Sequence, residues 1–397
     1  MTEAATAAVD SARAWRAVVA GFLSMFTVFG VAYSFGAFFE PMAAEFGTGR
    51  GATSLVFSIT AFLYFVLGAL SGPAVDRFGP RPVLLAGAAV MGAGLLLTAT
   101  VQSIWVGYAT YGVGVGVGVA CAYQPMLAVI GGWFERRRSA ALGVAVAGIG
   151  LGTVIVAPLA ARLIERYGWR TTYAIFGVAA AALLVLAAAR AERPPQPTVA
   201  RHPVRLRDSI RTRAFVCLYA SVLLLSLGLF QVFVYVVDFA QTIGIGRVAG
   251  ATLVSIVGAA SVVGRLALGI IADRVGRLAT YRSCFLVMGL SFGIWLTASS
   301  YGALVAFALV LGTAYGGFIT LSPAVAAEVF GVTGLGGLIG VLYTGAGVGS
   351  LFGPPLAGLL IDATGGYRWA IAASGLVAMA SWAVLLLLRQ PRRAPAR

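Results

Sequence analysis

Twelve long apolar runs alternate with short polar segments along the chain. An α-helix needs about 20 mostly apolar residues to cross the hydrocarbon core of a bilayer. Lipid offers the backbone no hydrogen-bonding partner, so a run of this kind has to be helical. The pattern predicts twelve membrane-spanning helices at 15–39, 53–75, 82–101, 104–130, 139–164, 170–189, 214–240, 248–273, 280–299, 302–326, 335–361 and 368–388.

One sequence motif, Gly-x-x-x-Asp-Arg-x-Gly, occurs twice, and its second copy begins at Gly269, 197 residues after Gly72. The same offset carries Gly143 and Pro158 onto Gly340 and Pro355. Repetition at one spacing indicates internal duplication. We therefore expect an all-α membrane protein of twelve transmembrane helices in two pseudo-symmetric six-helix bundles. The bundles would span residues 1–189 and 214–397, with a cytoplasmic linker at 190–213 that contains four prolines.

Composition and charge agree with a membrane protein. Hydrophobic residues make up 60% and charged residues 10% of the chain, and the mean hydropathy is +0.95. A soluble domain is typically about 25% charged. The net charge of +15 comes from 28 basic residues, all of them arginine. These arginines lie in short clusters between apolar runs, which favours a role in topology over binding of nucleic acid.

The arginines also predict the orientation of the chain. If both termini are cytoplasmic, 21 of the 28 arginines lie on that side, as the positive-inside rule requires. The first 14 residues are small and polar and contain no cleavable signal peptide, so we expect a cytoplasmic tail. The location expected is the bacterial inner membrane. The single histidine, His202, falls in the linker and is expected to be solvated.

The repeated motif follows the second and eighth predicted spans, where we expect short loops. Its glycines allow tight turns, and its charged groups can form contacts that hold one conformation and break in another. The alternative is a plain solvated turn. The candidate gating residues are Gly72, Asp76, Arg77, Gly79, Arg81, Gly269, Asp273, Arg274, Gly276 and Arg277.

Arg265 is the only basic residue well inside a predicted span. An arginine at mid-membrane costs roughly 2.5–3.5 kcal/mol on insertion scales, so it needs a compensating role. It lies about eight residues, or ~12 Å, from the cytoplasmic end of its helix, too far for relaxed snorkelling. A guanidinium binds a carboxylate bidentately, so we expect Arg265 to bind an anionic substrate. The alternative is a structural ion pair.

Several polar side chains occur in the middle half of their spans. A tyrosine hydroxyl buried at that depth needs a hydrogen-bonding partner, which a bound carboxylate can supply. Packing alone is the alternative for each of them. The candidates for substrate binding are Tyr33, Tyr123, Gln231, Tyr235, Tyr315 and Tyr343.

Asp238, near the outer end of the seventh predicted span, is the only acidic residue plausibly inside the membrane. A carboxylate removed from water takes up a proton more readily, which makes Asp238 the candidate for proton coupling. The alternative is that it faces outside water.

Two segments, GPAVDRFGPRP and GIIADRVGR, resemble the loop signature of the major facilitator superfamily. Further motifs are similar to those of bacterial monocarboxylate and oxalate/formate transporters, which have an arginine in the substrate cavity: YSFGAFFEPMAAEFG, WFERRRSAALGVAVAGIGLG, GWR and SVVGRLALGIIADRVGR. The resemblance implies transport of small carboxylates, often with protons, through a cavity lined by the helices that hold the candidate tyrosines.

Departures from the family pattern refine this expectation. Relatives of the oxalate type carry a lysine in the eleventh helix where this chain has Ala346, so a single buried cation favours a monocarboxylate such as lactate. Acidic or histidine residues of related transporters align with Tyr235, Thr242 and Ser261, which weakens proton symport by the family route. Anion antiport therefore stays open.

Other functional classes find less support. Drug efflux transporters favour an acidic cavity and, in many cases, a Gly-Pro pair in the fifth helix. Here the fifth helix reads GIGLGTVIVAPLA and lacks that pair, and the duplicated halves argue against a membrane sensor.

The run GVGVGVGVA lacks the lysine and the preceding strand of a phosphate loop, so helix packing explains it better. The three cysteines have no metal-ligand spacing. We expect no enzyme activity, no cofactor, no metal and no nucleic acid, and a monomer in the lipid bilayer.

Overall fold

A computed structural model describes residues 10–195, 209–331 and 335–388, and this part of the chain is helical with no strand. Eleven helical segments among the described residues are long and apolar enough to cross a membrane. The prediction of an all-helical, multi-pass membrane protein is confirmed.

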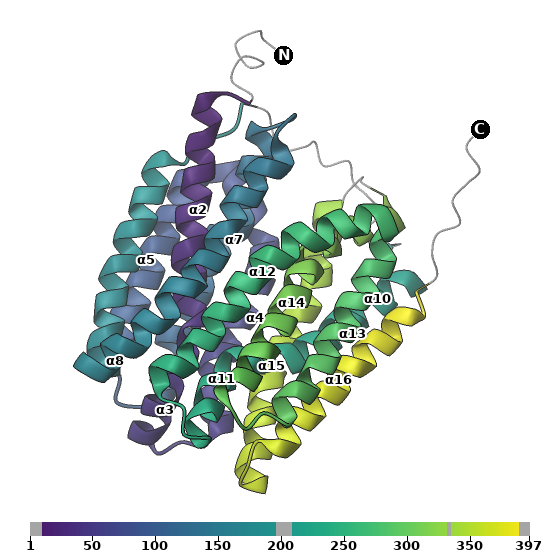
Figure 1. Cartoon of the computed structure of the whole chain (residues 1–397). Coiled ribbons are helices and arrows are strands. Elements are labelled where there is room, and N and C mark those ends of the chain that lie inside the picture. The colour runs from purple at the N-terminus through teal and green to yellow at the C-terminus, as the bar shows by residue number, and fades with distance from the viewer. Residues whose placement is uncertain (1–9, 196–208, 332–334, 389–397) are drawn as a thin grey trace.

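The helices fall into two groups along the chain, coloured purple to teal and green to yellow in Figure 1. The first group contains α2 (Ala12–Tyr33), α3 (Phe35–Phe46), α4 (Arg50–Phe78), α5 (Pro80–Thr98), α6 (Ile104–Gly107), the π-helix η1 (Tyr108–Val113), α7 (Gly114–Trp133) and α8 (Arg138–Arg190). The second contains α10 (Arg213–Leu229), α11 (Gln231–Thr242), α12 (Arg247–Val275), α13 (Arg277–Leu296), α14 (Tyr301–Phe330), α15 (Leu335–Thr364) and α16 (Arg368–Leu386). We call the two groups the first half and the second half.

α8 is 53 residues long and contains a kink at Gly168. Its backbone there has φ 79° and ψ 163°, which is not helical and which a residue with a Cβ rarely adopts. Two helices therefore meet at Gly168. The predicted spans 139–164 and 170–189 have their boundary at this point.

Glycines repeat the packing of the first half in the second. A Cβ at Gly148 or Gly152 of α8 would overlap the backbone of α2 at Phe22 or Phe26. In the second half, 197 residues later, a Cβ at Gly349 of α15 would overlap the backbone of α10 at Leu223, and one at Gly345 would lie 3.2 Å from Tyr219. Small residues of this kind let membrane helices approach closely. The internal repeat thus preserves a specific helix contact as well as sequence letters.

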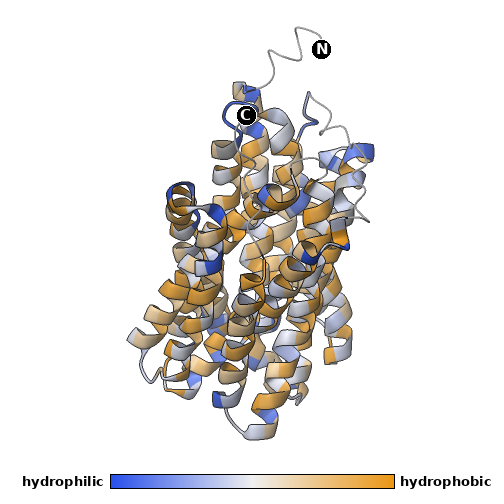
Figure 2. Ribbon diagram, turned by 90° about the vertical axis from the view of Figure 1, so that its right-hand side faces the viewer, coloured by the Kyte–Doolittle hydropathy of each residue, from blue (hydrophilic) through white to orange (hydrophobic). Residues whose placement is uncertain are grey.

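Helix pairs that connect the halves in the described part of the chain include α4 with α15, α8 with α12, and α3 with both α11 and α12. We call the face where α2 begins and α16 ends the terminal face, and the opposite face the distal face. Figure 2 shows apolar residues along the helices and many of the most hydrophilic residues at their ends. The helices of both halves thus present apolar residues along their length, as lipid-facing helices do.

The tail before α2 is attached to the start of α8 at the terminal face. The Asp10 carboxylate accepts hydrogen bonds from the backbone N–H groups of Arg136, Arg137 and Glu135 at 3.0, 3.2 and 3.4 Å. These bonds, that of Arg136 foremost, hold the pKa of Asp10 below its ordinary value. Much of the predicted linker, with His202, lies outside the described residues.

We predict that Gly316→Ala lowers the free energy of unfolding by about 1–3 kcal/mol, the usual range for overpacking. A Cβ at Gly316 of α14 would overlap the Ser261 carbonyl oxygen of α12 and lie 2.9 Å from the backbone nitrogen of Arg265. The control is Gly302→Ala in the same helix, where no atom lies within 4 Å of the added Cβ. Thermal unfolding in detergent measures both variants. Equal stability of the two would contradict the close contact of α12 with α14.

Candidate functional site

Arg265 of α12 lies at the interface between the halves. Its side chain is partly buried, and its Nη1 donates a hydrogen bond to the Val146 carbonyl oxygen of α8 at 3.1 Å. The guanidinium is thus fixed at one end by the backbone of the opposite half.

The other two guanidinium nitrogens of Arg265 are buried and have no hydrogen-bond partner among the described residues. These are Nε and Nη2, which form one edge of the planar group and point two N–H bonds in nearly parallel directions. This edge matches the two oxygens of a carboxylate. No carboxylate in the described part of the chain forms an ion pair with Arg265. A buried charge with a free bidentate edge is what an anion-binding site requires.

Three of the predicted tyrosines lie near this guanidinium: Tyr123 of α7, Tyr315 of α14 and Tyr343 of α15. Tyr33 of α2 joins them, because its hydroxyl lies 3.2 Å from that of Tyr315. The structure therefore brings four sequence candidates from both halves together around Arg265.

Aromatic rings enclose the hydroxyls. Tyr33 stacks on Phe233 of the second half at 4.3 Å between ring centroids, and Phe29 meets Tyr123 edge-on at 5.0 Å. Tyr64 of α4, which the sequence analysis did not select, is buried and hydrogen-bonds to Tyr33. The one feature of Tyr64 in the sequence that could have indicated a role in the site is its hydroxyl inside the second predicted span. The site is thus a polar centre, Arg265 and hydroxyls, in a frame of apolar rings.

The other predicted residues of the seventh span occupy different positions. Gln231 opens α11, is buried, and its Nε2 has no hydrogen-bond partner in the described region. Tyr235 donates hydrogen bonds to the carbonyl oxygens of Arg50 and Pro354, at 3.2 and 2.8 Å. Tyr235 thus joins α11 to α4 and α15 at the distal face, away from Arg265.

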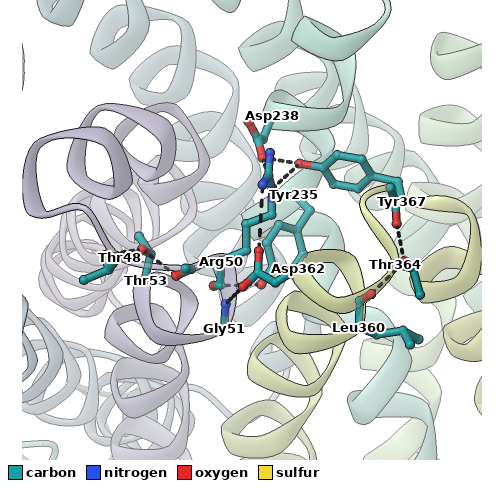
Figure 3. Close-up of polar contacts among 12 residues, drawn as sticks. Thr48, Arg50, Gly51, Thr53, Tyr235, Asp238, Leu360, Asp362, Thr364 and Tyr367 are labelled. Atoms are coloured by element: carbon teal, nitrogen blue, oxygen red, sulfur yellow. Dashed lines mark hydrogen bonds and ion pairs between the residues drawn. The ribbon is translucent and has the colours of Figure 1, made fainter.

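Asp238 lies in the same distal network, shown in Figure 3. It is 5% exposed, and its Oδ2 accepts hydrogen bonds from Nε of Arg50, at 3.2 Å, and from the Tyr367 hydroxyl. Arg50 also approaches Asp362 of α15, with Nη1 3.8 Å from Oδ1. Asp238 is thus buried in an ion pair between the halves, which disfavours the alternative that it simply faces outside water. Its role in proton coupling stays a prediction.

The repeated motif is helical, and its prediction as a loop is wrong for most of its length. α4 continues to Phe78 and α12 to Val275, so Gly72, Asp76, Arg77, Gly269, Asp273 and Arg274 all lie within these helices. Only Gly79 and Gly276 break them, with φ of 90° and 109°. Arg81 and Arg277 then lie near the starts of α5 and α13.

Among the motif's charges, Asp273 and Arg277 form an exposed ion pair at 3.8 Å within the second half. Such a pair is worth little in water. A role for the motif as a conformational latch at the terminal face stays a prediction.

Known proteins identify the fold that presents this site. The family model described as Major Facilitator Superfamily matches residues 20–278 and 240–397. The chain belongs to the Major Facilitator Superfamily. It is accordingly a multi-pass membrane transporter and not an enzyme.

Curated relatives of this transporter include monocarboxylate transporters. Monocarboxylate transporter 3 of Rattus norvegicus is 35% identical over 376 residues, which cover 89% of this chain and 76% of that protein. Monocarboxylate transporter 4 of Rattus norvegicus is 32% identical over 380 residues, with 91% and 81% coverage.

A solved structure shares the fold at low sequence identity. The crystal structure of a bacterial homologue of the human lysosomal transporter Spinster, inward-facing and unoccupied, aligns with a TM-score of 0.78 at 13% identity. The alignment covers 96% of this chain and 97% of that one. This likeness extends the superfamily fold to the full length of the transporter.

We predict that Ser261→Asp stabilises the transporter and weakens its binding of anions. Ser261 lies one helical turn before Arg265, where a carboxylate would pair with the free guanidinium edge. The melting temperature of the Ser261→Asp variant should rise by about 2 °C or more. Added lactate should stabilise this variant less than it stabilises the parent protein.

The matched control is Ser261→Asn, which has nearly the same size and no charge. It should retain the parent's response to lactate. Equal behaviour of the two variants in thermal unfolding would show that Arg265 does not lack a counter-ion.

Proposed function

We propose that this transporter moves a small monocarboxylate of the lactate type across the bacterial inner membrane, with the proton gradient driving uptake. The unpartnered Nε–Nη2 edge of Arg265 carries the proposal. Two charge-assisted hydrogen bonds from that edge would hold the substrate carboxylate, and hydroxyls of Tyr123, Tyr315 and Tyr343 would meet its remaining lone pairs.

One buried cation supports a substrate with one carboxylate. Ala346 of α15, at the position of the second cation in oxalate-type relatives, is 3% exposed and adds no charge. A dicarboxylate would leave its second charge unpaired among aromatic rings, at a cost of several kcal/mol. The names of the curated relatives at 35% and 32% identity support the same substrate class.

The mechanism that we propose is alternating access between two six-helix bundles. A single helix of 53 residues would be ~80 Å long, more than twice the ~30 Å hydrocarbon core, so we count the two parts of α8 as separate spans and the total as twelve. Rocking of the halves about α4–α15 and α8–α12 would expose the site to either side. We further propose that the protein acts as a monomer with both termini in the cytoplasm.

Anion exchange is a second candidate function, favoured by one observation. Arg265 has no carboxylate partner in the described region, so the empty transporter carries an unpaired charge between the halves. When the empty transporter returns to its first conformation, this unpaired charge has to pass through an interface without water, which costs free energy. A second anion would neutralise it during the return step.

Uptake of labelled lactate into proteoliposomes tests the proposed function. Arg265→Ala should lower uptake at least 100-fold, because two charge-assisted hydrogen bonds are worth about 3–6 kcal/mol. Arg265→Lys keeps the charge but loses the fork, so its KM should rise about tenfold. An inward proton gradient should stimulate the parent protein, and a stimulus from internal lactate alone would favour exchange.

The control is Arg162→Ala, which removes an exposed arginine of α8 and should leave uptake unchanged. Absence of carboxylate uptake by the folded parent protein, with transport of cationic dyes instead, would contradict the proposed substrate class.

A further inference from the structure

At the terminal face of the first half, one acid pairs with two arginines. Glu192 follows α8, the last helix of that half, and its carboxylate accepts a hydrogen bond from Nε of Arg13 on α2 at 2.7 Å. Arg16, one turn further along α2, has its Nη1 3.7 Å from the same carboxylate. The start of α2 and the end of α8 are therefore joined by opposite charges.

The second half keeps an arginine of this contact and lacks the acid. The counterpart of Arg16, 197 residues later, is Arg213 at the start of α10. The repeat aligns Glu192 with Arg389 at an offset of 197 and with Gln390 at an offset of 198, and neither residue is acidic. Arg213 forms no ion pair in the part of the chain that the structure describes.

The second half also has an additional cation nearby. Arg282 of α13 stands where the first half has Leu85. Its Nη2 donates hydrogen bonds to the carbonyl oxygens of Leu386, at 3.4 Å, and of Leu388, at the end of α16. Its Nε is buried and has no hydrogen-bond partner among the described residues. The terminal end of this half therefore has two arginines, and no acid of the described segments pairs with either.

A pocket of about 310 Å³ lies between the start of α10 and the end of α16. Its lining residues are Arg213, Ala214, Leu387 and Leu388. α16 packs against both α10 and α13 (Figure 1). Arg282 lies beside this pocket, because it donates to the carbonyl oxygen of the lining residue Leu388. The pocket thus combines guanidinium groups with apolar side chains at the end of a helix bundle.

We propose that this pocket binds a phosphate group, carried by an anionic phospholipid, as the anion that takes the place of Glu192 in the second half. The two free oxygens of a phosphodiester share one negative charge and fit an arginine fork. Under the orientation proposed above, the terminal face meets the cytoplasmic leaflet. Basic pockets between membrane helices on that side bind such head groups.

The apolar side chains around the pocket favour a lipid over free phosphate. Leu387 is 54% exposed, and Val216, about one turn beyond Arg213 on α10, is 56% exposed. Acyl chains can cover both side chains, and this burial of apolar surface adds to the affinity. Inorganic phosphate would contact the guanidinium groups alone. The lipid would join α10 to α16 at the terminal face, whichever substrate is transported.

Native mass spectrometry of the full chain in detergent tests the site without transport. Phosphatidylglycerol should bind at least fivefold more tightly than phosphatidylcholine with the same acyl chains. Arg213→Gln should lower the affinity for phosphatidylglycerol about fivefold, the loss expected for one arginine at a membrane surface. The matched control is Arg16→Gln, which removes the repeat-equivalent arginine that Glu192 already neutralises, and which should keep the parent's affinity.

A second pair of variants tests the pocket while retaining its arginines. Ala214→Glu places a carboxylate in the pocket and should lower the affinity for phosphatidylglycerol at least fivefold. Ala214→Gln, of the same size and uncharged, should bind more tightly than Ala214→Glu. Thermal unfolding checks that each variant is folded.

Two results would overturn the proposal. One is an affinity for phosphatidylglycerol that is the same in Arg213→Gln, Ala214→Glu and Arg16→Gln. The other is displacement of the lipid by an equal concentration of inorganic phosphate, which would exclude the phospholipid as the carrier of the phosphate group.

Discussion

The structure depends on one electrostatic constraint, a guanidinium held inside the membrane-spanning region that pairs with no carboxylate among the residues described. Burial of such a charge costs several kcal/mol unless a counter-ion is present. Within residues 10–195, 209–331 and 335–388, Nη1 is the one guanidinium nitrogen of Arg265 with a protein partner, the Val146 carbonyl oxygen of the other half. The missing counter-ion defines the ligand, and the bond to Val146 joins ligand binding to the interface that has to move.

Helix packing makes this placement sufficiently rigid. Gly264 and Gly316 let α12 and α14 touch backbone to backbone on either side of Arg265, so the helix that carries the charge cannot shift easily. Rings from both halves, such as Tyr33 on Phe233, then keep water away from the site. At the distal face the same two halves are joined by charges instead. The apolar centre favours binding of one anion, and the ionic rim joins the halves at the distal face.

Much of this could be predicted from the sequence because its signals are local. Apolar run length gives the spans, the repeat gives the halves, and the cost of a buried arginine singles out Arg265. Which side chains contact one another across the interface could not be predicted. Arg50 is at the end of a span, where arginines usually set topology, and Tyr64 has no feature that separates it from packing residues. The helical extension through Asp76 and Asp273 was missed because loop-forming glycines next to charges suggested an earlier helix end.

The central claim is that the Nε–Nη2 edge of Arg265 binds the substrate carboxylate, and the most direct test is a crystal structure with a short brominated monocarboxylate, located by anomalous scattering from bromine. The account predicts both carboxylate oxygens within about 3 Å of Nε and Nη2, with the Val146 contact of Nη1 retained. A carboxylate bound elsewhere, with this edge of Arg265 still unpartnered, would contradict it.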